Sequence, residues 1–417
     1  MTTSLRRTLQ YPSSILFYFG VILLPLNFFR FYGLAISDWA FILGLGVALI
    51  ETLSSDRKNL NVWGNNKIIF LVAVILLGAV LSSYRSQNMI TALIEIMQLM
   101  FVMTVFISFC WIMVRRGHTQ TLINVFIFTG VFAASVALID YYSGSNYGQI
   151  LSNATLRLLG GRYYGPLGHP NKLGFYLVLS FIPAAYRLIF YPLGRASILF
   201  GIFCILQLVG IYLSGSVTAF IGLSFGLLVL VLKSGFHKNR FSQLIILLLL
   251  FLSSVIISVR IVDGQPMPAV ITGIQSNIDR VTNLTASIRM ETFRDAFDYL
   301  IDRPVLGYGF DQLGGSGLAA TDRILPMEIH NIFLQVWFGG GLISLVGFIG
   351  IYIYLGLKSL EYVILKSANF TFGLAVCVLA FIVMDQFQVA IYQREKWLIV
   401  GLFLGNIWAV SDKSSTR

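Results

Sequence analysis

A histidine and an asparagine stand side by side at the start of a long apolar run, EIHNIFLQVWFGGG, at residues 328–341. The imidazole of His330 has an ordinary pKa near neutrality, which suits a general base that takes a proton from a hydroxyl. Asn331 could hydrogen-bond a sugar or the backbone. The alternative is that His330 is an interfacial side chain at a helix start, with no chemical role.

Arginines form the second group of candidates. Two stretches without long apolar runs, 143–171 and 262–329, contain seven arginines and no lysine. Guanidinium groups bind phosphate through paired donors, so this choice of basic residue favours a phosphate or diphosphate ligand. The alternative is that loops carry scattered charges. The seven residues are Arg157, Arg162, Arg280, Arg289, Arg294, Arg303 and Arg323.

Two carboxylates interrupt apolar runs. Asp385 lies in FIVMDQFQVAIYQREKW, where an ionisable side chain is costly enough to be a functional candidate. The alternative is a local ion pair with Arg394 or Lys396. Glu95 lies close to the start of its own run, where we expect an interfacial role.

The composition indicates a membrane protein with many spans. Of the 417 residues, 57% are hydrophobic and 11% are charged, and the mean hydropathy is +0.81. Ordinary soluble chains are about 25% charged. The formal net charge of +11 is explained by basic cytoplasmic loops and anionic lipid headgroups. We therefore predict membrane lipids, and no nucleic acid, as partners.

No motif for a metal or cofactor is present. The sequence has no Walker motif, zinc-ligand spacing or EF-hand, and the glycines at 307–317 lack the sheet unit of a nucleotide-binding loop. Cys110, Cys204 and Cys377 all fall in apolar runs and form no disulfide framework. We expect chemistry by side chains alone, without metal or cofactor.

Membrane helices must position these side chains. A bilayer core needs about 20 apolar residues per helix, and backbone groups that face lipid must be bonded internally. The apolar runs predict an all-α polytopic fold with about twelve spans. The spans are 13–29, 34–50, 67–82, 90–113, 121–142, 172–190, 196–213, 217–232, 242–261, 330–356, 369–390 and 397–411.

The predicted organisation alternates helices with two long loops. Five spans fill residues 1–142 and four fill 172–261, with the first loop, 143–171, between them. The second loop, 262–329, precedes three spans in 330–417. Long ordered segments between short connections usually carry function, so both loops are candidate contributors to a site.

Basic residues predict the orientation of the chain. With the N-terminus in the cytoplasm, the cytoplasmic loops hold sixteen lysines and arginines and the opposite short loops hold seven. The positive-inside rule then places both termini in the cytoplasm and both long loops outside. His330 is expected at the outer membrane face, where the second loop re-enters the bilayer.

The second loop contains a predicted amphipathic helix at 286–303. Its apolar residues recur with helical period at Phe293, Ala296, Phe297, Leu300 and Ile301. Arg289 shares that apolar face, and an arginine on a buried face needs an anion.

Three stretches in order resemble one family, the O-antigen ligase and polysaccharide polymerase superfamily of GT-C-type membrane glycosyltransferases. They are RYYGPLGHPN, which holds Arg162, Gly165, Pro170 and Asn171, then SIRMETFRDAFDYLIDRPVLGYGF, then the His-Asn pair followed by Gly341. The Asp385 region resembles a late-helix aspartate of the ligases. Together these stretches cover about 155 to 400.

The resemblance implies a reaction at the periplasmic face of the bacterial inner membrane. A glycan on undecaprenyl diphosphate is transferred to an acceptor hydroxyl, on another lipid-linked glycan in a polymerase or on lipid A-core in a ligase. His330 would act as the base, and no metal is implied. The implied substrate-binding residues are Arg157, Arg162, Arg289, Asn171, Asn331 and Asp385.

Two positions depart from the family pattern. Ser344 stands where a glycine is frequent, and Val217 stands where the family often has an arginine. Arg162 or another loop arginine would have to replace that guanidinium. Val217 favours a polymerase over a ligase.

Two other classes of function compete. A transporter or flippase of lipid-linked oligosaccharides would also have many spans and a basic cavity, but predicts ionisable groups near the midplane and repeated helices. A structural subunit would leave Arg289 on an apolar face unexplained.

The predicted topology can be tested by labelling. Cysteines placed at Ser145 and Ser316 should react with a membrane-impermeant thiol reagent in intact cells, because both positions are expected outside. Labelling of either position only after lysis would show that the predicted orientation is wrong there.

Overall fold

The computed structural model describes most of the predicted spans and parts of both long loops. It covers residues 11–26, 30–31, 34–54, 66–84, 86, 88–144, 147–152, 162–191, 195–234, 285–312, 324, 329–365 and 369–415. The ninth predicted span, 242–261, lies outside these residues. Within them the chain is helical except for turns and one short hairpin, β1 (Arg30–Phe31) with β2 (Leu34–Ala35).

Every predicted span that falls in the described residues contains a helix. Seven helical segments are long and apolar enough to cross a membrane, so the all-α polytopic fold is confirmed and the number of twelve spans stays a prediction. The helices are α2 (Pro12–Ile22), α3 (Ile36–Ser54), α4 (Asn66–Ser83), α5 (Met89–Met100), α6 (Phe106–Arg115), α7 (Thr119–Ser143), α8 (Tyr147–Ser152), α9 (Pro170–Phe190), α10 (Arg195–Ser214), α11 (Val217–Ser234), α14 (Thr285–Asp302), α15 (Ile332–Ile364), α16 (Phe370–Met384) and α17 (Arg394–Ser415). A π-helical segment, η1 (Phe101–Val105), joins α5 to α6, and η2 (Gly165–Leu167) and η4 (Phe310–Gln312) are 3₁₀ turns.

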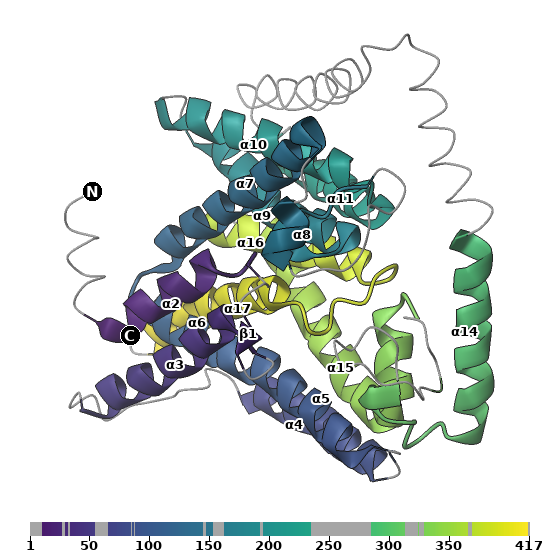
Figure 1. Cartoon of the computed structure of the whole chain (residues 1–417). Coiled ribbons are helices and arrows are strands. Elements are labelled where there is room, and N and C mark those ends of the chain that lie inside the picture. Colours follow the sequence, from purple (N-terminus) through teal and green to yellow (C-terminus); the bar gives the residue numbers. More distant parts are fainter. Residues whose placement is uncertain are drawn as a thin grey trace.

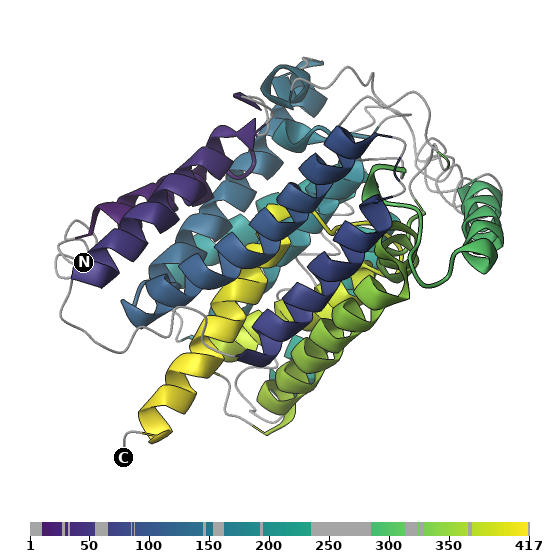
Figure 2. The same cartoon turned by 90° about the horizontal axis from the view of Figure 1, so that it is seen from below.

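The long helices form one bundle around α9. They run in roughly one direction in Figure 2, and α14 (green) lies at the edge of the molecule, outside the bundle, in both views (Figures 1 and 2). α9 is almost entirely buried and packs against α7, α10, α11, α16 and α17. Gly174 lets α9 approach the α10–α11 turn closely, because a Cβ there would lie 2.7 Å from that of Ala219. We call this end of the bundle, at which α9 and α11 begin, the α9 end.

α15 is two helical arms joined by a reversal at Gly341. The backbone there has φ 66° and ψ −173°, a conformation that only glycine adopts readily. The ring of Phe333 lies 5.8 Å from that of Phe348 and 5.0 Å from that of Tyr352. In one straight helix, residues 333 and 352 would be about 28 Å apart. Residues 332–340 therefore fold back antiparallel to the first half of residues 342–364.

This reversal corrects the single span predicted at 330–356. His330 does not stand at the far end of a straight helix. It lies at the base of the short first arm, near the level of Tyr352, which is about halfway along the second arm. The backbone of residues 304–309 covers the reversal, through hydrogen bonds from Leu342 N to Pro304 O (3.0 Å) and from Tyr308 N to Phe338 O (2.8 Å).

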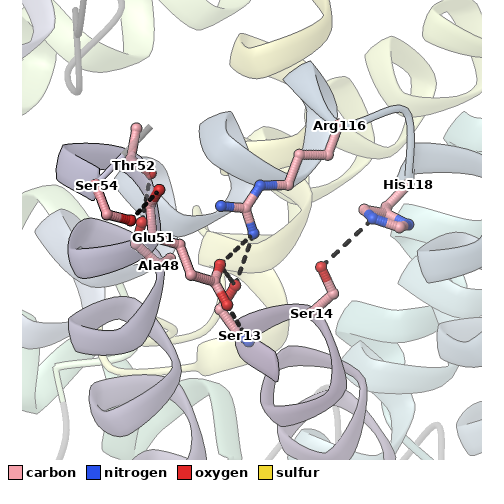
Figure 3. Close-up of polar contacts among 8 residues, drawn as sticks. All are labelled: Ser13, Ser14, Ala48, Glu51, Thr52, Ser54, Arg116 and His118. Carbon is pink, nitrogen blue, oxygen red and sulfur yellow. Dashed lines mark hydrogen bonds and ion pairs between the residues drawn. The ribbon is translucent and has the colours of Figure 1, made fainter. Parts of the chain in front are cut away.

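The opposite end of the bundle is held by a polar cluster (Figure 3). Arg116, after α6, forms an ion pair of 2.9 Å with Glu51 of α3, and Ser13 of α2 donates to the same carboxylate at 2.5 Å. His118, before α7, lies 3.4 Å from the hydroxyl of Ser14. These contacts join four helices at the end that the basic residues predict to be cytoplasmic.

The reversal makes a prediction about Gly341. A Cβ at this position would lie 2.0 Å from the carbonyl oxygen of Val305, and the backbone conformation costs a non-glycine residue about 1–3 kcal/mol on its own. Gly341→Ala should therefore lower the thermal unfolding temperature of the purified protein strongly. Gly46→Ala is the matched control, because it also changes a membrane-helix glycine and a Cβ there meets nothing within 4 Å. Equal unfolding temperatures for the two variants would contradict the reversal.

Candidate functional site

Arg162 lies flat against the turn between α10 and α11. Its Nε donates to Ser214 O at 2.9 Å, and its Nη2 donates to Asn171 Oδ1 at 2.6 Å. A Cβ on Gly215, where φ is +54°, would lie 3.2 Å from Arg162 Cγ and Nε, so this turn has room for the arginine only because it carries glycine. The two hydrogen bonds fix the plane of the guanidinium group, which is the property needed to bind an oxyanion in a defined orientation.

His169 caps the start of α9, next to this arginine. Its Nδ1 accepts a hydrogen bond from Asn171 N at 3.1 Å, so the neutral ring carries its proton on Nε2. Burial lowers the pKa of His169 to about 4, and the nearby charges of Lys172, Arg162 and His330 act in the same direction. The ring is therefore neutral at physiological pH. The positive end of the α9 dipole at the same place favours a bound anion.

The second unit is formed by His330 and Asn331 at the base of the first arm of α15. Asn331 caps the helix by accepting from Leu334 N at 3.0 Å, and its Nδ2 donates to Gln386 O at 3.3 Å. Ile332 N donates to Asp385 O at 3.1 Å. His330 has φ +55°, and it is the one non-glycine residue with positive φ in the described part of the chain. Such backbone persists where its surroundings impose it, as they often do at functional sites.

Asp385 forms a buried ion pair with Lys396. The distance from Lys396 Nζ to Asp385 Oδ2 is 2.9 Å, and both side chains are at most 1% exposed. Tyr352 of α15 donates to the same carboxylate oxygen, and Lys396 Nζ lies 2.8 Å from the Tyr352 hydroxyl. Arg394, the other partner considered, pairs with Asp38 instead. The alternative of a local ion pair is thus what the structure shows for Asp385.

The turn after α16 connects the two units. Gln386 O accepts a hydrogen bond from Asn331 Nδ2, and Gln388 Nε2 donates to Asn171 O at 3.4 Å. Segments near residues 165, 330 and 387, which are far apart in the sequence, are therefore held together at the α9 end. The arrangement combines a fixed guanidinium, a helix start, a neutral histidine and a second histidine, which together suit an anionic ligand and proton transfer from a hydroxyl.

The structure brings some of the residues predicted from the sequence together, and others lie outside the described residues. Arg162, Asn171, His330, Asn331 and Asp385 belong to this connected region. The backbone of Arg289 lies in α14, but its side chain is outside the described residues, and Arg157 lies outside them altogether. His169 was not among the residues predicted from the sequence, although Pro170 signals a helix start and so marks the residue before it as a possible cap.

α14 only partly matches its predicted apolar face. Ala296 and Leu300 are buried, whereas Phe297 is 46% exposed and Ile301 is 75% exposed. Ring contacts explain the difference, because α14 is held by Phe297 against Trp337 at 5.9 Å and by Tyr299 against Phe338 at 6.3 Å. α14 thus meets the first arm of α15 along its edge, and Ile301 points away from that contact.

Part of the chain resembles a known protein family. Residues 202–349 match the family model described as O-Antigen ligase. The matched segment contains Arg289, His330 and Gly341, and it lies between Asn171 and Asp385. It confirms the resemblance predicted from the motifs. The comparison with curated proteins found no match.

The lowered pKa of His169 predicts a pH effect on stability. Because the folded pKa (about 4) is below the ordinary value of 6.5, the unfolded chain binds the proton more tightly between these values. Stability should be full above pH 6.5 and should fall, by at most about 1.4 kcal/mol per pH unit, as the pH drops towards 4. His169→Asn keeps a capping side chain and removes the titration. Unfolding curves of the two proteins should diverge below pH 6.5, and parallel curves would show that His169 titrates normally when folded.

Proposed function

Because residues 202–349 match the O-antigen ligase family, we propose that this multi-pass membrane protein transfers a glycan from undecaprenyl diphosphate to an acceptor hydroxyl at the α9 end of the bundle. The observation that carries the proposal is the connection of the Arg162–Asn171 unit to the His330–Asn331 unit through the turn after α16. The predicted orientation puts this end at the outer face of the membrane, and the resemblance implies the periplasmic face of the bacterial inner membrane.

The diphosphate would bind at Arg162 and the start of α9. Arg162 reaches the turn directly before Val217, the position at which the family often has an arginine. This contact supports the interpretation that Arg162 replaces the missing family guanidinium. Arg157 and Arg289 would add charge from the two long loops. Asn171 would hold Arg162 in place, since its Oδ1 accepts from the guanidinium.

The reaction needs one bond to form and one to break. The acceptor oxygen attacks the anomeric carbon, the bond from that carbon to the diphosphate oxygen breaks, and the electron pair leaves with the diphosphate. Fixed positive groups stabilise the charge that develops there, so no general acid is required. The acceptor hydroxyl proton passes to His330, and a single displacement inverts the configuration.

Asp385 would act through position rather than through contact with substrate. The Oδ2 atom of its carboxylate is occupied by Lys396 and Tyr352, whereas Oδ1 is buried without a partner in the described residues. Its carbonyl oxygen accepts from Ile332 N, two residues after His330. We infer that this hydrogen bond sets the position of His330 along the bundle relative to Arg162. Both Oδ1 and Nδ2 of Asn331 already form hydrogen bonds. Asn331 would therefore orient the first arm of α15, and only the edge of its amide group would contact the glycan.

The acceptor and the competing function are separate questions. Val217 favours a second lipid-linked glycan as acceptor, as in a polymerase, over lipid A-core. A transporter of lipid-linked oligosaccharides remains the second candidate, and the buried Asp385–Lys396 pair is the observation that favours it. Incubation of the purified protein with lipid-diphosphate glycan and each acceptor separates these functions, because only an enzyme forms a new glycosidic bond.

Arg162→Lys should weaken use of the donor. Lysine keeps the charge but lacks the planar fork that meets Ser214 and Asn171 at the same time, so we expect the apparent donor affinity to fall about tenfold or more. Arg187→Lys, at the opposite end of α9, is the matched control and should leave donor affinity unchanged. Full activity with unchanged donor affinity in Arg162→Lys would make Arg162 a structural residue.

His330→Gln should abolish transfer while donor binding persists. Glutamine retains hydrogen bonding but has no basicity, so the rate should fall by about 10²–10⁴-fold. His118→Gln, at the opposite end of the bundle, is the control, and it should transfer glycan at the normal rate. If a folded His330→Gln protein transfers glycan as fast as the wild type, histidine has no part in the mechanism.

A further inference from the structure

A second polar group is buried at the α9 end, and nothing in the proposed chemistry uses it. It consists of Glu95 from α5, Asp311 and Gln312 from η4, and Tyr392 and Gln393 from the turn before α17, and we call it the carboxylate–amide cluster. Glu95 is fully buried, Asp311 is 2% exposed and Gln312 is 4% exposed. Glu95 is therefore covered by protein, and its expected place near the membrane interface stays a prediction.

Direct contacts hold the cluster together. Asp311 Oδ2 accepts hydrogen bonds from Ser86 Oγ and from Gln312 Nε2, each at 2.5 Å. α5 packs against η4, which brings Glu95 to the same region. Burial, and then the negative charges of Glu95 and Asp311, raise the pKa of Tyr392, so both carboxylates lie near its hydroxyl.

Several polar atoms of the cluster are buried without a partner in the described part of the chain. In η4 they are Asp311 Oδ1 and Gln312 Oε1. Both polar side-chain atoms of Gln393, which directly follows Tyr392 in the chain, are also buried without a partner. Gln312 is anchored inside the cluster by its own bond to Asp311. Since buried polar groups are normally satisfied, this concentration of unsatisfied atoms points to a polar ligand.

The chemistry of the cluster favours hydroxyl groups as that ligand. Carboxylates repel a diphosphate, so the anionic part of the donor is excluded. The described residues contain no group of three or more His, Cys, Asp or Glu side chains placed to ligate a metal. Carboxylate oxygens accept from hydroxyls, and amide side chains both donate and accept, as sugar hydroxyls require.

The cluster is offset from His330 along the first arm of α15. Gly309 N, beside η4, donates to Gly339 O at 3.0 Å, near the Gly341 end of the arm, whereas His330 is at its base. Residues 332 and 339 are about 10 Å apart along a helix. The segment after α16 contacts Asn331 through Gln386 and Asn171 through Gln388. The same segment continues along the chain to Tyr392 and Gln393. A ligand at the cluster would therefore lie beside the reaction centre.

We propose that the carboxylate–amide cluster is a binding subsite for the hydroxyl groups of a neutral glycan, beyond the sugar that reacts. The inference rests on the proposed glycan transfer, and it adds the residues that recognise the sugar chain. The glycan can belong to the donor or to the acceptor, since both present the same hydroxyl chemistry to the site.

Three probes test the subsite on the purified full-length protein. They are undecaprenyl diphosphate without sugar, the same lipid carrying a neutral trisaccharide, and the free trisaccharide. Asp311→Asn and Gln312→Met keep side-chain volume but remove the charge and the amide. Each should weaken binding of a trisaccharide probe about tenfold or more, and each should leave binding of the sugar-free lipid unchanged, which also shows that the variant is folded. Glu51→Gln, at the opposite end, is the matched control and should change no affinity.

The outcome identifies the source of the glycan. Weaker binding of the lipid-linked trisaccharide assigns the subsite to the donor, and weaker binding of the free trisaccharide alone assigns it to the acceptor. Unchanged binding of both, or an equal loss for all three probes, overturns the proposal. A wild-type protein that binds trisaccharide through these residues but forms no glycosidic bond would keep the subsite and refute the transfer function instead.

Discussion

The ion pair between Asp385 and Lys396 is the interaction on which the geometry of the site depends. Two charges buried in an apolar interior must be paired and hydrogen-bonded, and removing one partner of such a pair typically costs about 3–5 kcal/mol. Here the pair links α17 to the end of α16, and the Tyr352 hydroxyl ties it to the second arm of α15. The carbonyl of Asp385 then receives Ile332 N, so the first arm is fixed to the same point. The position of His330 thus follows from a charge pair that it does not touch.

Groups of both charges lie at this end of the bundle. Arg162 and the start of α9 lie where the turn after α16 meets Asn171, and the carboxylate of Glu395 is buried near Lys172. Asp311 and Gln312 lie near the Gly341 end of the first arm of α15. A lipid-linked glycan has an anionic diphosphate and neutral sugars. In the proposed function the diphosphate binds at Arg162 and the sugars bind at the carboxylate–amide cluster, which would place the anomeric bond near His330.

Sequence patterns predicted which residues form helices better than how those helices are arranged in space. Apolar runs of membrane length located the long apolar helices in the described residues, because lipid exposure requires such runs. The reversal at Gly341 was not visible, since glycine is ordinary in membrane helices and the run continues without a polar break. Asp385 could be recognised as a candidate by its type, but its partner could not, because Arg394 and Lys396 lie beyond a turn of unknown conformation. The burial of Glu95 against η4 was not visible either, because η4 lies more than 200 residues further along the chain.

The reversal places His330, the proposed base, at the base of a short arm. A catalytic group must be held within a small distance of the reacting atoms, and a long external loop holds its residues poorly. The first arm of α15 is anchored at both ends: at its tip by the backbone of residues 304–309 around Gly341, and at its base by Asp385 and Gln386. His330 lies directly before the base anchor and has left-handed backbone, which the surroundings must stabilise. The chain therefore returns from its second loop into the bundle before the membrane helix begins, and the histidine stands on packed helices beside Arg162 rather than on the loop.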